Sequence, residues 1–199
     1  WAAWTAIAPR RRAEIARSMI ELAEDNVDLD FSTAMLWLTD DDDAEVRASA
    51  AEGLWESESS TVLHRLLGLL RADPAPAVRA RAAMSLNRFA YRAELDELSN
   101  SDATAVRDVL LGTLRDARQP SEVHRRALET AGYFANIAEV QQYVGQAYQS
   151  DDQLLRESAL VAMGRSMLPR WMPTIAKELA SPSPALRYEA AHAVGEYAE

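Results

Sequence analysis

The segment DDDAEVRASAAEGLW, residues 41–55, decides the fold because its pattern returns along the chain. It joins an acidic turn, a Val-Arg pair and a run of small residues spaced for one helical face. Four more copies follow, APAVRARAAMSLNRF (75–89), PSEVHRRALETAGYF (120–134), DDQLLRESALVAMGR (151–165) and SPALRYEAAHAVGEY (183–197). Self-similarity at a period of 20 to 50 residues is typical of repeat architectures.

Each copy is built around one anchor residue, and the anchors are 32, 45, 32 and 31 residues apart: Val46, Val78, Val123, Leu155 and Leu186. Small or apolar residues follow each anchor after four and eight positions, so the three positions share one face of a helix. A second apolar segment precedes every copy, and a turn containing Asp, Ser or Pro separates the two. The repeating unit is therefore predicted to be a helical hairpin.

A hairpin of this size cannot bury its apolar face alone, whereas stacked hairpins can. The sequence thus predicts an all-α fold, a right-handed α-α superhelix of about five helical-hairpin repeats plus an N-terminal helix. Scarce glycine (7 residues) and few β-branched or aromatic runs also favour helix over strand.

The acidic turn, the Val-Arg pair and the Ala/Leu/Gly helix resemble the HEAT repeat, in the short form also found in phycobilisome-lyase-like proteins. The resemblance covers about residues 30–199, and the proteins it points to are bacterial HEAT-repeat proteins to which no agreed activity attaches. Two departures stand out. His124 replaces the usual Arg, and about 13 extra residues separate Val78 from Val123.

We expect a single repeat domain over residues 1–199 that is a piece of a longer array. Its expected parts are a degenerate N-terminal unit (1–29), repeats 1 and 2 (30–91), an insertion (92–103) and repeats 3 to 5 (104–199). The helix that begins at Pro9 is expected to be the second helix of the degenerate unit, with Trp1 and Trp4 packed on the first full repeat.

The insertion allows two interpretations. It is either a binding loop that projects from the ridge or a longer helix with a polar connection. The second interpretation is favoured, and it predicts that Leu95 and Leu98 pack inward.

Composition limits the classes of partner. The net charge of -10, from 31 acidic and 21 basic residues, disfavours nucleic acid and anionic lipid. No apolar run reaches about 18 residues, so no membrane span is expected. Without cysteine, disulfides and thiolate metal sites are excluded, and a cytoplasmic location is consistent with this. Because the ends of a solenoid expose apolar layers, a monomer or a weak end-to-end dimer is expected.

Nothing in the sequence points to catalysis, a metal or a cofactor. The histidines His64, His124 and His192 lie on different repeats, and the His-Glu pairs that hold iron in the HEAT-type enzyme deoxyhypusine hydroxylase do not occur. There is no GxSxG motif and no glycine-rich phosphate loop. The carboxylates of residues 40–43 suit a divalent cation, but their position before a helix favours a capping role.

The arginine after the anchor forms either a binding row or a structural ladder that joins successive layers. In HEAT-like units this arginine commonly reaches an acidic residue of the turn, so the ladder is favoured here. Its expected members are Arg47, Arg79, Arg156, Arg187, Asp43, Asp73 and Asp152. The run Arg10–Arg12 is interpreted as a solvated helix face in preference to a phosphate site.

The second helices of such solenoids line the concave side. Positions two, six and nine or ten after each anchor should point away from the core. The expected binding residues are Glu52, Trp55, Met84, Arg88, Arg125, Glu129, Tyr133, Arg165, Tyr188 and His192. Exposed aromatic and arginine side chains beside acids are typical of protein-binding surfaces. An alternative places Trp55 and Tyr133 in gaps between layers.

The sequence therefore predicts a non-catalytic scaffold that binds a protein partner on its concave face. The alternative is a lyase-like or chaperone-like accessory subunit that holds a substrate protein for modification. Nucleic-acid binding is the weakest interpretation, because the acidic charge opposes it.

Overall fold

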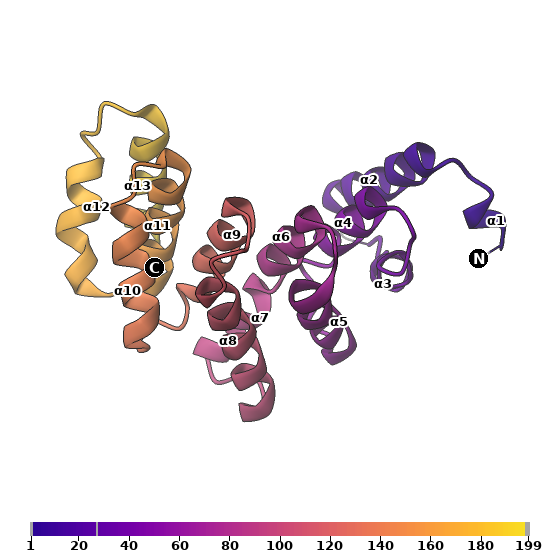
Figure 1. The fold of residues 1–199 in the computed structure, drawn as a ribbon, viewed down its shortest axis with the longest axis horizontal. Helices are drawn as coiled ribbons and strands as arrows, with labels where there is room; N and C mark the ends of the chain where they lie inside the picture. Colours follow the sequence, from indigo (N-terminus) through magenta and orange to yellow (C-terminus); the bar gives the residue numbers. More distant parts are fainter. Residues whose placement is uncertain (1, 27, 198–199) are drawn as a thin grey trace. The chain divides into compact units, whose positions relative to one another are not determined.

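The computed structural model describes residues 2–26 and 28–197, and every regular element in this part of the chain is helical (Figure 1). The elements form helical hairpins, which confirms the predicted α-solenoid. Contacts divide the chain into two compact units, Trp1–Arg88 (unit 1) and Phe89–Glu199 (unit 2). The boundary falls inside helix α7 (Asn87–Glu94).

Unit 1 holds two complete hairpins and the helices that precede them. Its elements are α1 (Ala2–Thr5), α2 (Pro9–Asp25), α3 (Ser32–Leu38), α4 (Ala44–Glu52), α5 (Ser60–Ala72), α6 (Pro76–Ser85) and the start of α7. Helices α3 and α4 pair as one hairpin, and α5 and α6 as the next. Helices α2, α4 and α6 pack side by side, so α2 occupies the place of a second helix, as its period predicted.

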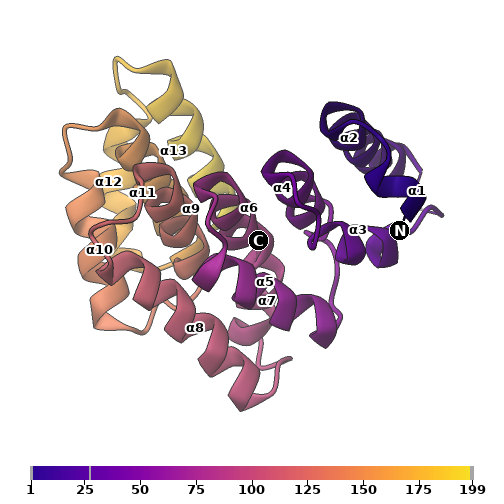
Figure 2. The same cartoon turned by 45° about the vertical axis from the view of Figure 1, so that its right-hand side comes forward.

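Unit 2 holds three hairpins. Its elements are the rest of α7, α8 (Asn100–Arg115), α9 (Ser121–Ala131), α10 (Ala138–Tyr148), α11 (Gln153–Ser166), a 3-10 turn η1 (Pro169–Trp171), α12 (Met172–Glu178) and α13 (Pro184–Glu196). The hairpins are α8–α9, α10–α11 and α12–α13 (Figures 1 and 2). The second helices α9, α11 and α13 pack directly on one another and form a continuous layer.

The anchor positions form the core, as the sequence predicts. In the copies anchored at Val46, Val78 and Val123, the residues at positions zero, four and eight are all buried. In the last two copies Leu155 and Val194 are only half-buried. Burial of one face per helix explains why the repeat carries small or apolar residues at this spacing.

Close helix packing in unit 2 depends on two glycines. A Cβ atom on Gly132 would lie 2.8 Å from the carbonyl oxygen of Ala162 and 2.9 Å from its Cα. A Cβ atom on Gly164 would lie 2.9 Å from the Cα of Ala193. Glycine at these positions lets α9, α11 and α13 approach until their backbones nearly touch.

Side chains of the turns cap the second helices. The carboxylate of Asp43 accepts hydrogen bonds from the backbone N–H groups of Glu45 and Val46, at 2.9 and 3.2 Å. Asp152 accepts from Leu154 and Ser183 from Leu186 in the same way. These contacts satisfy amides that a helix start leaves unpaired, and they support the capping interpretation of the acidic run.

The insertion differs in part from its prediction. The chain continues from α6 into α7, where Phe89 and Ala90 are fully buried, so the segment does start as a helical extension. Leu95, however, is 48% exposed, and the prediction that it packs inward is wrong. The left-handed conformation of Asp96 (φ 56°) follows the end of α7 at Glu94, so the helix does not continue through the insertion. Leu98 is half-buried.

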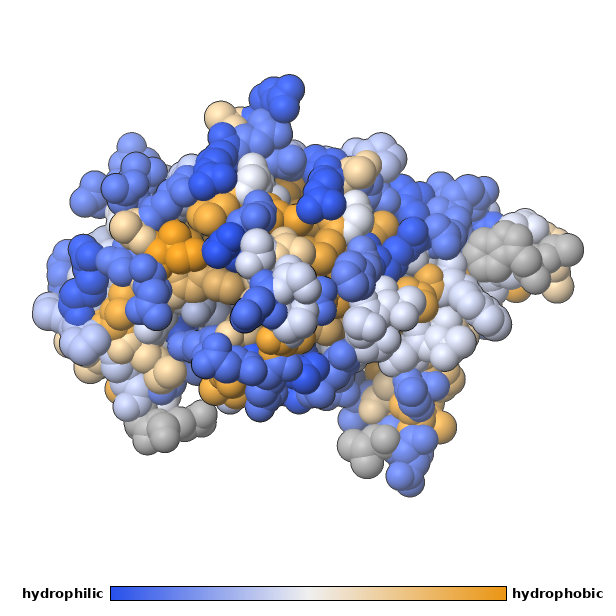
Figure 3. Space-filling view, turned by 90° about the horizontal axis from the view of Figure 1, so that it is seen from below, coloured by the Kyte–Doolittle hydropathy of each residue, from blue (hydrophilic) through white to orange (hydrophobic). Residues whose placement is uncertain are grey.

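At the N-terminal end the indole Nε1 of Trp4 donates a hydrogen bond to the carboxylate of Asp41 at 2.6 Å, so Trp4 does contact the first full repeat. Trp1 lies outside the described residues. On the face that Figure 3 shows, hydrophilic side chains predominate and hydrophobic ones lie in patches between them. None of the described helices is long and apolar enough to cross a membrane.

Candidate functional site

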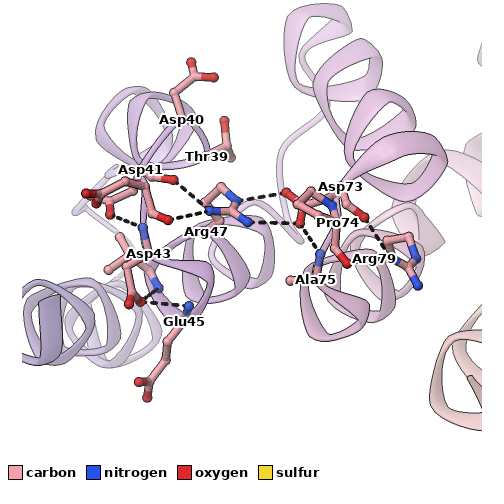
Figure 4. Close-up of polar contacts among 12 residues, drawn as sticks. Thr39, Asp40, Asp41, Asp43, Glu45, Arg47, Asp73, Pro74, Ala75 and Arg79 are labelled. Carbon is pink, nitrogen blue, oxygen red and sulfur yellow. Dashed lines mark hydrogen bonds and ion pairs between the residues drawn. The ribbon is translucent and has the colours of Figure 1, made fainter.

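Arg47 links two hairpin turns of unit 1. Its Nη1 donates to the backbone carbonyls of Asp41 (2.9 Å) and Asp42 (3.1 Å) in the turn of its own hairpin. Its Nε and Nη2 donate to the two carboxylate oxygens of Asp73, at 2.8 and 3.1 Å, in the turn of the next hairpin. Figure 4 shows the guanidinium between the two turns. The hydrogen bonds with Asp73 raise the pKa of Arg47, so its positive charge is maintained.

The contact with its own turn recurs at other anchors. Arg79 donates to the carbonyls of Asp73 (2.7 Å) and Pro74 (3.2 Å). Arg187 donates to those of Ser181 (2.8 Å) and Pro182 (3.1 Å). These arginines therefore hold the turn whose carbonyls a helix end leaves unpaired.

Two other anchors depart from this arrangement. The Nε2 of His124 lies 2.9 Å from the carbonyl of Asp116, so the histidine takes over the arginine's contact. The Nε of Arg156 is buried without a hydrogen-bond partner.

Of the three carboxylates expected in the ladder, only one accepts hydrogen bonds from an arginine that directly follows an anchor. Asp73 lies five residues before its anchor, and it binds Arg47. Asp43 and Asp152 lie three residues before theirs, where the side chains cap α4 and α11 instead. Asp152 also accepts from the hydroxyl of Ser121 at 3.3 Å. Because both side chains cap helices, the structure corrects the expectation that Asp43 and Asp152 form rungs of the ladder, meaning arginine–carboxylate pairs between layers.

A rung that sequence reasoning missed lies between Arg12 and Asp41. Arg12 is 2% exposed, and its Nη2 is 3.0 Å from the carboxylate of Asp41, which is also buried. The solvated-face interpretation was therefore wrong for Arg12, although Arg10 and Arg11 are exposed and pair with Glu14. The signal that could have found this pair is the spacing to the anchor. Asp41 lies five residues before Val46, just as Asp73 lies five residues before Val78.

The expected binding residues of unit 1 do not gather at one place. Glu52 accepts from Arg81 (3.1 Å), and Arg88 pairs with Glu58. Met84 is half-buried. Trp55 is 46% exposed, and it lines a groove with residues of α2 and α3, whereas none of the other three belongs to that lining.

In unit 2 the expected residues do gather. A shallow depression of about 360 Å³ crosses the layer of second helices. Its lining from α9 is Arg125, Arg126 and Glu129, from α11 Glu157, Ser158, Val161 and Arg165, and from α13 Tyr188, Glu189 and His192. Three successive second helices thus contribute to one surface, and Tyr188 at its edge is 68% exposed.

A polar network connects two helices beneath the depression. Ser158 donates to Glu129 at 2.6 Å, and Arg126 donates to the other oxygen of Glu129 at 2.9 Å. Arg125 donates to the hydroxyl of Ser158 and to the carbonyl of Leu154, both at 3.1 Å. Glu129, expected at the surface, is in fact only 7% exposed because these contacts hold it between α9 and α11.

Tyr133 follows α9 and lies between one aromatic and one cationic side chain. Its ring packs edge-on against Tyr91, with ring centroids 5.6 Å apart, and the guanidinium of Arg165 lies 5.5 Å from its centroid. Tyr133 is half-buried, which agrees with the alternative of a gap-filling aromatic, whereas Trp55 is exposed. Through Arg165 the tyrosine supports the edge of the depression.

Burial changes the acidity of one group in the depression. It raises the pKa of Glu189, which is half-buried and lies near the carboxylates of Glu129 and Glu157. The Nδ1 of His192 lies 3.8 Å from Glu196. Sequence reasoning missed Arg126, Ser158 and Glu189, each of which is one residue from a predicted position, because the helical phase was uncertain by that amount. Among the described residues no group of three or more His, Asp or Glu side chains is placed to hold a metal ion.

Comparison with known proteins agrees with this geometry. The sequence model described as HEAT repeats matches residues 32–115. These residues are HEAT repeats. The match covers α3 to α8, which includes the rung between Arg47 and Asp73. No curated protein sequence matches the chain.

Among solved structures the chain is similar to engineered proteins of the Northeast Structural Genomics Consortium. One shares 20% identity with a TM-score of 0.62, over 98% of this chain and 93% of its own. A second shares 18% identity with a TM-score of 0.61, over 94% and 92%. A third shares 20% identity with a TM-score of 0.57, over 94% of this chain and 54% of its own. At this identity the likeness shows the fold alone.

Proposed function

We propose that the protein is a non-catalytic scaffold that binds a protein partner on the second-helix layer of unit 2. The observation that carries the proposal is the depression on α9, α11 and α13, where an exposed tyrosine and three arginines lie among glutamates. Tyrosine and arginine are enriched among residues that dominate protein–protein binding energy. Repeat solenoids use such extended surfaces for binding.

The chemistry of the depression favours binding over catalysis. Its Glu129 and Ser158 side chains hydrogen-bond to each other and to arginines, in a network that joins α9 and α11. A nucleophile would need an adjacent base and a stabiliser for developing charge. Ser158 is only 1% exposed, and it donates a hydrogen bond to Glu129 while it accepts one from Arg125, so it joins two helices and is not open to a substrate.

Affinity capture from a lysate of the source organism tests the proposal. The bait is the whole chain, beside a Tyr188→Ala/His192→Ala double variant, which changes two exposed side chains of the depression. The matched control is Trp37→Ala, because Trp37 is a similarly exposed aromatic (65%) on the first helix α3. Circular dichroism establishes that all three proteins are folded.

We expect a partner that the wild type and the Trp37→Ala control retain and the double variant loses. Loss of one central aromatic side chain typically weakens an interface by about 2 kcal/mol or more, which is roughly thirtyfold in affinity. A partner that all three proteins retain would contradict the assignment to this surface.

A further inference from the structure

A second surface lies in unit 1, in a groove that the scaffold proposal does not use. The groove has a volume of about 530 Å³ and lies between α2, α3 and the connection from α4 to α5. Met35 and Val62 form its buried base, and Ile20, Phe31 and Trp55 line it above. Its volume is in the range of about 300 to 1,000 Å³ that is typical of sites for bound groups.

Four apolar side chains of the groove remain partly exposed to solvent. Met19, Ile20 and Phe31 are only half-buried, and Trp55 is 46% exposed. Burial of exposed apolar area contributes about 25 cal/mol per Å² to the binding free energy, which favours insertion of large apolar side chains of a partner. Methionine adapts its shape to the side chain that it contacts, and two methionines, Met19 and Met35, line this groove.

The rim of the groove is acidic. Its lining includes Glu24, Asp30, Glu56 and Glu58, and it includes no Arg, Lys or His. Glu58 is paired with Arg88, whereas no ion pair joins Glu24, Asp30 or Glu56 to a described residue. Hydrogen bonds from Ser32 lower the pKa of Asp30, so its carboxylate is charged at neutral pH.

We propose that this groove binds a basic amphipathic helix of a protein partner. The apolar side chains of such a helix would enter between α2 and α3, and its Lys or Arg residues would face Glu24, Asp30 and Glu56. Helices lay apolar positions i, i+3, i+4 and i+7 into grooves of this kind, and helix walls favour a helical occupant. The same acidic rim repels nucleic acid and anionic membranes.

The groove is independent of the depression in unit 2, since its lining lies wholly within residues 19–62. Failure of one proposal therefore leaves the other standing.

The test uses a fluorescein-labelled synthetic peptide of about 16 residues, which spans roughly 24 Å as a helix. It carries Leu at i, i+3, i+4 and i+7 and Lys elsewhere, and binding to the whole protein is followed by fluorescence anisotropy. One control peptide replaces every Lys by Glu, and another has the same composition in an order without an apolar face. We expect micromolar binding of the first peptide, and binding at least about tenfold weaker for both controls.

Variants of the protein locate the site. Trp55→Ala should weaken binding about tenfold, because it removes the largest exposed apolar side chain of the groove. Glu24→Gln/Glu56→Gln should weaken it about threefold and flatten its salt dependence, because two rim charges are lost. Glu122→Gln/Asp151→Asn removes two exposed charges from unit 2 and should leave binding unchanged.

Equal affinity for the three peptides, or unchanged binding by Trp55→Ala and by the Glu24/Glu56 variant, would overturn the proposal. A second copy of the chain is the other candidate occupant. Self-association that Trp55→Ala abolishes and the basic peptide does not reverse would assign the groove to that copy and also overturn the proposal.

Discussion

Units 1 and 2 build the same stack of hairpins with different contacts between layers. In unit 1 an arginine of one layer binds a carboxylate five residues before the next anchor, as in the pairs Arg12–Asp41 and Arg47–Asp73. In unit 2 the residues at that position are Arg118, Ser150 and Ser181, none of which is a carboxylate.

Unit 2 connects its layers by other means. The hydroxyl of Tyr148 donates to Glu178 and that of Ser158 donates to Glu129, each at 2.6 Å. Gly132 and Gly164 let the second helices approach closely. Both units keep apolar anchors and small residues on one helical face, while the carboxylate ladder is one of several ways to fix the register between layers.

The largest predicted difference comes from removal of an interlayer acceptor. Asp41→Ala removes the buried carboxylate partner of Arg12 and leaves its guanidinium paired only with the exposed Asp42, which should cost up to about 3–5 kcal/mol of the free energy of unfolding. Ser181→Ala removes a neutral hydroxyl at the matching position of unit 2 and should cost about 1 kcal/mol. Urea denaturation measures both, and equal losses would show that the ladder contributes no more than an ordinary turn.

Helix approach should matter more in unit 2 than in unit 1. Gly164→Ala forces a Cβ to within 3.0 Å of Ala193, so we expect a loss of about 1–3 kcal/mol of unfolding free energy. Gly195→Ala on α13 is the control, since no atom lies within 4 Å and the substitution should stabilise its helix by up to about 1 kcal/mol. Gly53→Ala meets only the side chains of Ile20 and Met35, at 3.1 Å, so its loss should be smaller than that of Gly164→Ala. Thermal unfolding of the three variants gives the order, and a stabilised Gly164→Ala protein would contradict it.

The hydrogen bond between Tyr148 and Glu178 should make unit 2 sensitive to alkaline pH. Burial, together with the hydrogen bond to Glu178, raises the pKa of Tyr148 from 10.0 to about 12. Burial alone would also raise the pKa of Glu178, but hydrogen bonds from Tyr148 and Ser181 lower it overall. Because the folded-state pKa of Tyr148 is raised, its contribution to stability is complete below pH 10 and is lost as the pH rises through about 12.

Tyr148→Phe should therefore cost about 1–2 kcal/mol at neutral pH and remove part of the loss of stability above pH 10. Tyrosinate absorbance should show a step near pH 12 that is absent from the variant. An unchanged titration curve would show that Tyr148 is not the group responsible.

The smallest predicted effect is the same in both units. Gly68 in α5 and Gly112 in α8 have open space where a Cβ would lie. Replacement of either by Ala should stabilise the protein by about 0.5–1 kcal/mol, because glycine has a low helix propensity. Similar shifts of the urea midpoint are expected, and a loss of stability at either site would reveal packing that the structure does not contain.

The sequence predicted the hairpins because anchor periodicity and turn chemistry are local signals. It placed Arg125, Arg165, Tyr188 and His192 on one surface because the helical period carries over from copy to copy. It failed for Arg12, whose partner Asp41 lies on another layer, 29 residues away along the chain. It also failed for Leu95, because the residue in the left-handed conformation after the helix is Asp96, and no glycine in the sequence marks that position as a helix end.

Glu129 illustrates a different limit. Its helical phase points to the surface, yet Arg126 and Ser158 satisfy its carboxylate in the interior. Buried polar groups are stable when such partners exist, and the partners come from a neighbouring repeat that sequence phase does not reveal.

The most direct test of the scaffold proposal is site-specific photo-crosslinking in lysate of the source organism. A photoreactive amino acid is placed at Val161 or Tyr188, in the depression, and at Trp37 or Gln146, on first helices. The account predicts one discrete protein adduct from both depression positions and none from the two controls. Adducts only from the first-helix positions, or from no position at all, would contradict it.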